Sequence, residues 1–404
     1  MDGKKSEFEG QRNIVMSGLV SLVTDIASYM VEPVLPLFLV GVLGASTILV
    51  GLIEGIAETT ASLLKIFSGW FSDYVGKRKP LMLVGYALSN ILRPIFGLTA
   101  SWGQVLAIKF ADKIGKGLRT APRDALLADS ASEGGIGKAF GLHRTFDELG
   151  SAIGPLLAFG ILSFFTGNYR LVFYCAAVPG TLAILIIIFG IRDKAPRKKE
   201  AFKAPALGFK GMGSGFIIFS LIATVFTLGN SSDAFLILRA KNAGLTTALV
   251  PLAYFVFYIT FSVFSYPLGA LSDTLGRRPL IIAGFMVFSL VYLGFAFASK
   301  PWHIWILFIA YGLYSAATDG IQRSYIADLT PAGKRGMGMG TFNALIGLAA
   351  LPASVLAGFL WNIKGPIAAF GFGSLMAFIA CLLLLILGGK IQAQSPIRKT
   401  LNQR

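Results

Sequence analysis

The sequence predicts an all-α, polytopic membrane protein of about twelve transmembrane helices in two pseudo-symmetric halves of six. Hydrophobic residues make up 55% of the 404 residues and charged residues only 14%, with a mean hydropathy of +0.71. A soluble domain carries about 25% charged residues. The apolar residues fall into long runs, and one short motif occurs twice, 200 residues apart. Together these observations favour a lipid-embedded, internally duplicated chain.

The apolar runs define the predicted spans and domains. In chain order they are 14–40, 47–71, 80–98, 103–128, 139–165, 171–191, 213–238, 247–272, 280–298, 304–328, 336–361 and 367–389. Each is near or above the roughly 20 residues that a helix needs to cross the hydrocarbon core. We therefore expect a first half (1–191), a basic cytoplasmic linker (192–210) and a second half (211–404). Residues 1–13 are polar and the first run is too long for a signal sequence, so no cleavable signal peptide is expected.

The basic residues predict the orientation. A net charge of +16 is compatible with nucleic-acid binding, but the cations lie largely between apolar runs, which is typical of a cytoplasmic membrane face. With the N-terminus inside, the inner segments hold 22 Lys and Arg residues and the outer segments 5. We expect a multi-pass protein of the cytoplasmic (inner) cell membrane with both termini cytoplasmic, and no nucleic-acid partner.

The duplicated motif is a short charged loop between apolar runs. It reads GWFSDYVGKRK from Gly69 to Lys79 and GALSDTLGRRP from Gly269 to Pro279. The first glycine of each copy, Gly69 or Gly269, would permit close helix approach, and the second would permit a turn that a β-carbon obstructs. The duplication continues from Arg123 to Asp129, which matches Arg323 to Asp328 with one residue deleted.

The pattern Gly-x-x-x-Asp-x-x-Gly-basic-basic resembles the signature loop of the major facilitator superfamily of secondary transporters, and the resemblance covers the whole chain. It implies two six-helix halves related by an axis along the membrane normal, a substrate site between them and alternating access. It also implies a cytoplasmic gate whose basic residues bind carboxylates or helix C-termini of the other half. Simple anchoring at the lipid headgroups is the alternative. The gate residues would be Gly69, Asp73, Gly76, Lys77, Arg78, Arg123, Gly269, Asp273, Gly276, Arg277, Arg278 and Arg323.

Charges inside the spans are concentrated in the first half. A charge near the bilayer centre costs a few kcal/mol, so such residues are candidates for function. Asp25 and Glu32 are seven apart on the first span, hence on one helical face, and Glu54 and Glu58 are four apart on the second. The fourth span carries one stripe of charge, formed by Asp112, Lys116, Arg119 and Arg123. The fifth opens with His143, Arg144, Asp147 and Glu148.

These groups must pair with one another or face water, and a buried carboxylate can exchange a proton. We predict substrate-binding or proton-coupling roles for Asp25, Glu32, Glu54, Glu58, Lys116, Arg119, Arg144, Asp147, Glu148, Asn230 and Asp233. A structural ion-pair network is the alternative, favoured for Lys109, Lys113, Arg123 and Asp124. The superfamily's third helix lies outside the cavity, so Arg93 is expected to snorkel or pair locally. His143 could titrate, although its place near the cytoplasmic end favours an interfacial residue.

In the second half, a polar stretch from Thr227 to Asp233 interrupts the seventh span. Such breaks often present hydrogen-bonding groups to a substrate. Asn230 and Asp233 are therefore the candidates for the opposite wall of the site, with Gln322 and Asn343 behind them.

The fifth span contains Gly150, Gly154 and Pro155, which resemble the Gly-x-x-x-Gly-Pro core of the superfamily's antiporter motif, without its trailing Gly-Gly. A packing face of small residues with a proline kink is the equal alternative. The superfamily's arginine four residues before Gly115 is Ala111 here, so its proton-coupling role does not carry over to that position.

The function predicted is secondary transport of a small organic solute, proton-coupled, with export by antiport a further expectation and an anionic or zwitterionic solute slightly favoured. The alternatives are broad efflux of lipophilic cations, using Asp25, Glu32 and Glu58, or an uncoupled facilitator. No nucleophile–base set or nucleotide motif is present, so no enzyme is expected. The sequence implies no cofactor and no metal site. The expected partners are the solute, protons and the lipid bilayer, and the protein is expected to be a monomer.

Overall fold

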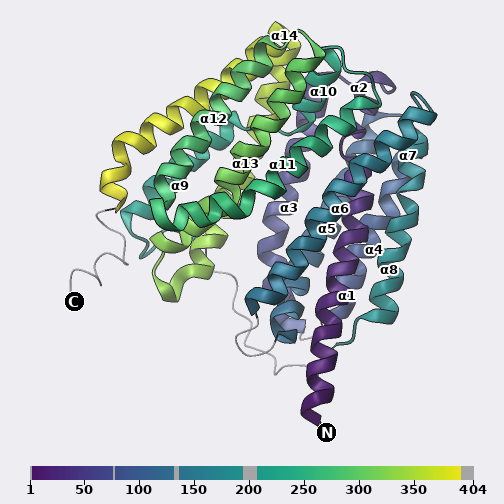
Figure 1. The fold of residues 1–404 in the computed structure, drawn as a ribbon, viewed down its shortest axis with the longest axis vertical. Helices are drawn as coiled ribbons and strands as arrows, with labels where there is room; N and C mark the ends of the chain where they lie inside the picture. Colours follow the sequence, from purple (N-terminus) through teal and green to yellow (C-terminus); the bar gives the residue numbers. More distant parts are fainter. Residues whose placement is uncertain (1, 76–77, 132–135, 194–206, 393–404) are drawn as a thin grey trace. The chain divides into compact units, whose positions relative to one another are not determined.

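The computed structural model describes residues 2–75, 78–131, 136–193 and 207–392 as helices joined by short connections (Figure 1). No β-strand occurs among these residues. The all-α fold predicted from the sequence is therefore confirmed. Most of the predicted basic linker, including 194–206, lies outside the described residues, so the predicted domain boundaries remain a prediction.

The described residues of the first half form eight α-helices. They are α1 (Asp2–Val31), α2 (Leu35–Gly41), α3 (Thr47–Val75), α4 (Lys79–Ile95), α5 (Trp102–Ser130), α6 (Ile136–Phe164), α7 (Tyr169–Cys175) and α8 (Ala177–Gly190), with a 3₁₀ turn at Phe96–Leu98. The first predicted span is α1 plus α2, separated by a turn over residues 32–34. Pro33 explains this break, because proline removes a backbone donor and disfavours helical backbone in the residue before it. The sixth span is α7 plus α8, separated at Ala176.

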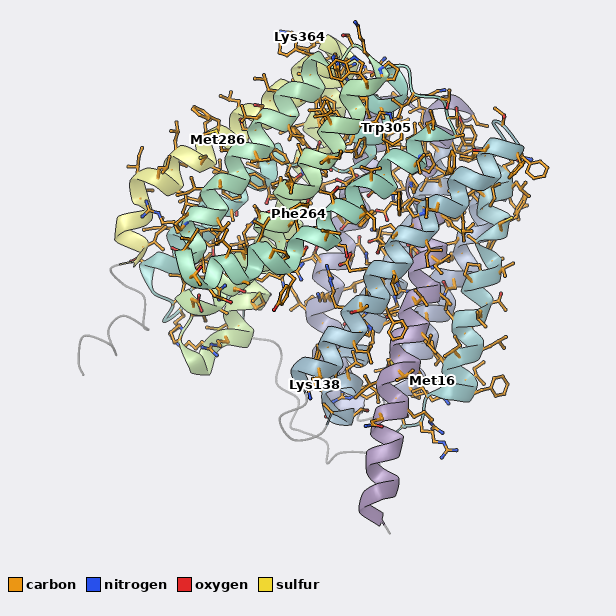
Figure 2. The ribbon with its side chains drawn as sticks, viewed as in Figure 1. Met16, Lys138, Phe264, Met286, Trp305 and Lys364 are labelled. Atoms are coloured by element: carbon orange, nitrogen blue, oxygen red, sulfur yellow. The ribbon has the colours of Figure 1, made fainter. Side chains whose placement is uncertain are left out.

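The second half contains α9 (Ser214–Gly229), α10 (Ala234–Asn242), α11 (Leu249–Leu275), α12 (Arg277–Phe297), α13 (Pro301–Leu329) and α14 (Arg335–Gln392), with a 3₁₀ turn at Ala332–Lys334. The seventh span is α9 plus α10, interrupted at residues 230–233, as the polar stretch predicted. Within α14 the backbone is not helical at Gly365, which has φ 75° and ψ −176°. This break, next to Lys364 in Figure 2, separates the eleventh and twelfth spans.

The number of spans agrees with the prediction. In the described part of the chain, ten helical segments are long and apolar enough to cross a membrane. One of them, Arg335–Gly389, contains the Gly365 break and so provides two spans. The remaining span is α5, which is 29 residues long but is not among the ten, because it carries the charged stripe.

The helices form two compact units. The first comprises Met1–Gly44, Thr60–Pro205 and Thr246–Phe255, and the second Ala45–Thr59, Ala206–Leu245 and Val256–Arg404. In the first unit α1 packs mainly on α6 and α8, and α4 on α5 and α8. In the second, α14 packs on α9 and α12, and α12 also on α13. The helix α3 of the first half is divided between the units, as is α11 of the second half.

Glycines allow the closest helix contacts in the first unit. A β-carbon at Gly150 would lie 2.5 Å from the Leu22 carbonyl oxygen, and one at Gly154 would lie 2.8 Å from that of Ile26. The packing interpretation of these two glycines is therefore confirmed: they let α6 rest directly on α1. Whether they also serve an antiport mechanism stays a prediction.

The loop glycines behave differently from one another. Gly276 has φ 93°, a left-handed backbone that favours glycine, so the predicted turn is confirmed there. The close approach predicted at Gly269 is wrong, since a β-carbon would meet no described atom within 4 Å. This end of α11 is poorly covered: Phe264 (Figure 2) is 42% exposed and Tyr266 85% exposed. Gly69, Asp73, Gly76 and Lys77 lie outside the residues whose side chains the structure describes.

The described basic residues of the two loops make matching contacts within their own halves. In the first half, Arg78 Nε lies 3.8 Å from Asp129 Oδ2, and Lys79 Nζ donates to the Ile188 and Ile191 carbonyls at the end of α8.

In the second half, Arg277 Nε lies 3.5 Å from Asp328 Oδ2, and Arg278 donates to the Leu384 and Leu385 carbonyls of α14. Arg277 also pairs with Asp273. By contact, Arg78 thus corresponds to Arg277, 199 positions on, because the first loop has one more residue between its second glycine and its proline. The sequence predicted bonds of these cations to the other half, whereas the contacts just described are internal to each half.

Candidate functional site

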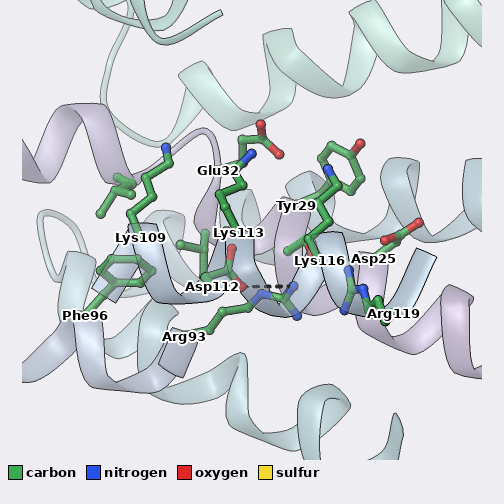
Figure 3. Close-up of a pocket in the computed structure, with 13 residues that line it drawn as sticks. Asp25, Tyr29, Glu32, Arg93, Phe96, Lys109, Asp112, Lys113, Lys116 and Arg119 are labelled. Atoms are coloured by element: carbon green, nitrogen blue, oxygen red, sulfur yellow. Dashed lines mark ion pairs between the residues drawn. The ribbon is translucent and has the colours of Figure 1, made fainter. Parts of the chain in front are cut away.

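A polar pocket lies within the first unit (Figure 3). Its cavity volume is about 60 Å³, room for roughly four water molecules at ~15 Å³ each. It is lined by α1, α5, the start of α2, the end of α4 and the turns after α1 and α4. The lining residues are Asp25, Ser28, Tyr29, Val31, Glu32, Leu35, Arg93, Phe96, Lys109, Asp112, Lys113, Lys116 and Arg119.

One wall of the pocket is a row of cations on α5. Lys109, Lys113, Lys116 and Arg119 follow one another at intervals of four, three and three residues, so they share a face of the helix. At a rise of 1.5 Å per residue the row is ~15 Å long. The sequence favoured a structural role for Lys109 and Lys113, but both line the pocket and are 8% and 7% exposed. The pocket wall therefore extends further than the predicted stripe.

Arg119 is the cation whose environment points most directly to a ligand. It is 5% exposed, and its Cζ lies 4.4 Å from the centroid of the Tyr86 ring, a cation–π contact. A β-carbon at Gly85 would lie 2.8 Å from Arg119 Cβ, so the glycine lets α4 approach α5 here. Arg119 Nη1 is buried and has no hydrogen-bond partner in the described chain. A buried donor without an acceptor is costly, and an anion in the pocket would supply one.

Arg93 lies at the base of the pocket and is 4% exposed. Its Nη2 is 3.6 Å from Asp112 Oδ1, the ion pair dashed in Figure 3. Its Nη1 donates to Asn90 Oδ1 at 2.5 Å and to the Thr24 carbonyl at 3.2 Å. Local pairing, one of the two predicted outcomes, is confirmed, and snorkelling is wrong. The sequence analysis did not predict that Arg93 lines the pocket. The polar residues Ser89, Asn90 and Arg93 on one face of α4 could have indicated it.

Two carboxylates complete the lining. Asp25 of α1 lies within electrostatic range of Lys116, Arg119, Arg123 and Asp147. Glu32 lies in the turn after α1, not on its helical face as predicted, because α1 ends at Val31. The Glu32 amide still donates to the Ser28 carbonyl at 2.9 Å, which keeps the side chain at the same pocket as Asp25. Four of the predicted residues, Asp25, Glu32, Lys116 and Arg119, are thus brought together.

The charged turn of α6 lies beside this pocket but does not line it. Arg144 Nη2 pairs with Glu148 Oε1 at 2.6 Å, and the Arg144 side chain is 55% exposed. His143 Nδ1 lies 3.4 Å from Asp147 Oδ2. The His143 side chain is only 4% exposed, with Ser21 Oγ of α1 2.8 Å from its Nε2, and its interfacial position stays a prediction.

The other predicted residues of the first half are elsewhere. Glu54 and Glu58 lie on the part of α3 that belongs to the second unit and are not among the pocket residues. Arg123, predicted for the gate, donates to Ser21 Oγ at 3.4 Å and pairs with Asp124 at 2.9 Å.

In the second unit, the break between α9 and α10 meets tyrosines. Tyr311 donates to Asp233 Oδ1 at 2.8 Å, and Asn230 Nδ2 donates to Tyr314 at 3.3 Å. Both tyrosines belong to an aromatic cluster, in which the Tyr311 ring centroid lies 5.0 Å from that of Phe257. The sequence named the two polar residues but not their tyrosine partners, although Tyr311 and Tyr314 are three apart on one helix face.

The remaining predicted residues take no part in a described site. Arg323 pairs with Asp319 on its own helix at 2.9 Å and is 56% exposed. Gln322 and Asn343 are half-buried. Within the described residues, no group of three or more His, Cys, Asp or Glu could hold a metal ion.

Comparisons with known proteins show the family of this chain. The family model described as Major Facilitator Superfamily matches residues 18–239 and 212–401. An uncharacterised MFS-type transporter of Methanocaldococcus jannaschii is 33% identical over 390 residues, covering 95% of this chain and 96% of that protein. The multidrug resistance protein MdtG of Dickeya zeae is 25% identical over 326 residues, covering 78% of each.

A solved structure has the same fold. The crystal structure of a mutant of the peptide transporter POT in complex with sulfate superposes with a TM-score of 0.79 at 14% identity. The match covers 95% of this chain and 96% of that one.

Proposed function

Because the chain belongs to the Major Facilitator Superfamily, we propose that it is a secondary transporter that carries a small anionic or zwitterionic organic solute, together with a proton, by alternating access. It acts as a multi-pass protein of the cytoplasmic membrane. The proposal rests on one observation: a polar pocket in the first unit whose wall is a row of cations on α5. The predicted gate residues serve the conformational change.

The negative charge of the solute is inferred from the surroundings of Arg119. Its guanidinium is held against Tyr86, and its buried Nη1 donor has no acceptor among the residues that the structure describes. Guanidinium binds carboxylate or phosphate through two parallel hydrogen bonds. A carboxylate or phosphate group of the solute would satisfy that donor and lie beside Lys116, which lines the same pocket.

The coupling to a proton is inferred from the position of Asp25 in the same pocket. An ionised Asp25 competes with an anionic solute for Lys116 and Arg119, both within its electrostatic range. A proton on Asp25 removes this competition, so proton and anion favour each other's binding. Such co-binding gives transport of both in the same direction.

A second candidate is efflux of lipophilic cations in exchange for protons. The similarity to a protein described as a multidrug resistance protein supports it, as do the carboxylates of Asp25 and Glu32 in the pocket. A cation would compete with the proton for the same carboxylates. The two candidates therefore predict proton movement of opposite direction.

The test uses proteoliposomes with a pH-sensitive dye inside, equal pH on both sides and a clamped membrane potential. Pools of organic anions and pools of lipophilic cations are added outside, with protein-free vesicles as the blank. We expect an anion pool to acidify the lumen in a protein-dependent way. Alkalinisation by a cation pool would replace the proposal with the second candidate.

Asp25→Asn separates coupling from binding in the same vesicles. We expect it to abolish proton movement while labelled solute still exchanges. Arg170→Gln is the matched control, because Arg170 donates to the Thr99 carbonyl away from the pocket and should leave the flux unchanged. Solute equilibration without any proton movement in the wild type would indicate an uncoupled facilitator and contradict the coupling.

A further inference from the structure

Ser21 is the centre of a buried polar network on the α6 side of the first unit. Its hydroxyl lies 2.8 Å from His143 Nε2 and 3.3 Å from the Tyr86 hydroxyl, and it accepts from Arg123 Nη1 at 3.4 Å. Four helices, α1, α4, α5 and α6, thus meet at one side chain that is 2% exposed. Buried polar groups in a membrane protein mark proton or ion pathways.

The network continues through His143 to Asp147. The imidazole has Ser21 at one nitrogen and Asp147 Oδ2, 3.4 Å away, at the other. Asp147 Oδ1 is buried and has no hydrogen-bond partner in the described chain. A carboxylate oxygen in that position is left unsatisfied, and a bound proton removes the charge that makes this costly.

Asp147 also connects the network to the pocket. One turn further along α6, Gly150 packs on α1, where its β-carbon would lie 2.9 Å from Asp25 Cβ. Asp25 and Asp147 consequently interact electrostatically. The charge on Asp147 therefore acts on the carboxylate that lines the pocket.

The charged and titratable groups around Asp147 come from every helix that packs there. They are His143, Arg144 and Glu148 of α6, Asp25 of α1, Arg123 and Asp124 of α5, and, through Ser21, Tyr86 of α4. Arg144 and Arg123 each have a carboxylate partner, Glu148 and Asp124. Both arginines also act electrostatically on Asp147.

From this arrangement we propose that His143 and Asp147 form a proton-binding site that relays protons to Asp25. A proton reaching Nε2 through the Ser21 hydroxyl makes an imidazolium, whose Nδ1 proton passes to Asp147 Oδ2. The histidine returns to its neutral form, and no bond between heavier atoms changes. The inference rests on the proposed proton coupling and adds the route that the proton takes.

Infrared difference spectroscopy of the full-length protein in lipid tests this without a solute, because a protonated carboxyl group has its own C=O band. We expect the wild type to gain this band as the pH is lowered, and Asp147→Asn to lose the part of it that Asp147 contributes while Asp25 keeps its own. His143→Gln should gain it at a different pH. Asp319→Asn is the matched control: its carboxylate pairs with Arg323 on α13, and the band should be unchanged.

A conservative variant distinguishes loss of the carboxyl group from misfolding of the protein. Asp147→Glu keeps an ionisable carboxyl, so it should restore a pH-dependent band. The proposal is overturned if the wild type shows no such band, if Asp147→Asn keeps it at full intensity, or if Asp147→Glu fails to restore it. Solute-coupled proton flux in a wild type without this band would contradict the relay and leave the transport proposal standing.

Discussion

The two halves attach their basic loops in the same way, yet their interiors differ in chemistry. In each half an arginine of the loop pairs with an aspartate at the end of a long helix, Arg78 with Asp129 and Arg277 with Asp328. In each half the next basic residue donates to carbonyls near the end of that half's last helix. The first predicted span of each half is also broken, with Glu32 or Asp233 in the break.

The interiors differ where α5 and α13 correspond. Within the first unit, α5 presents Lys113 and Arg119 to a pocket. In the second, α13 presents Tyr311 and Tyr314 to an aromatic cluster. The repeated feature is thus the attachment of the loops, whereas the buried chemistry has diverged. We infer that the first half supplies the charged part of solute recognition and the second half a rigid frame.

The largest effect on transport is expected from Arg119→Gln. The change removes the cation whose buried Nη1 has no hydrogen-bond partner in the described chain. A hydrogen bond to a charged group is worth ~1.5–3 kcal/mol, so the half-saturating solute concentration should rise about 10–100-fold. Arg119→Lys should recover only part of this, since an ammonium cannot form the paired bonds. Vesicle flux measurements check it. An unchanged half-saturating concentration in Arg119→Gln would contradict the inference that the first half binds the charged part of the solute.

The next effect is expected on stability, from Gly154→Ala. The added β-carbon would lie 2.8 Å from the Ile26 carbonyl oxygen and 2.9 Å from the Met30 amide nitrogen, so backbone must move, at a cost of ~1–3 kcal/mol. Gly269→Ala is the control, because no described atom lies within 4 Å. Denaturant unfolding in detergent micelles measures both. Equal loss in the two variants would show that the α1–α6 contact is not a tight one.

Tyr311→Phe tests whether the second half is only a frame. The change removes the hydroxyl that donates to Asp233 and keeps the ring in its cluster, so unfolding should become easier by ~1.5 kcal/mol. If the second half is a frame, the half-saturating solute concentration should stay within about threefold, below 1 kcal/mol. A tenfold increase would instead make Asp233 part of the solute site, as the sequence predicted.

The smallest effect concerns the loop attachments. Double-mutant cycles of Arg78 with Asp129 and of Arg277 with Asp328 should each give a coupling energy below ~1 kcal/mol, since accessible ion pairs are weak. The first pair should couple more strongly, because its side chains are 11% and 19% exposed, whereas those of the second pair are 24% and 37% exposed. The reverse order would show that the two attachments are not equivalent.

The sequence by itself determined the class of fold and the break in the seventh span. Long apolar runs, the duplicated loop and the excess of charge in the first half need no tertiary information, because hydrophobic length and proline or glycine chemistry act locally. Even the interruption before Asp233 was legible from composition alone.

Only the tertiary structure decided which charges share a site. Lys109 and Lys113 join the pocket, and Arg93 does so through Asp112, because α4 and α5 cross closely at Gly85 and Gly115. His143 is buried for a similar reason, since α6 packs closely on α1 at Gly150 and Gly154. Helix periodicity fixes which residues share a face, but the partner of that face depends on contacts between segments far apart in sequence.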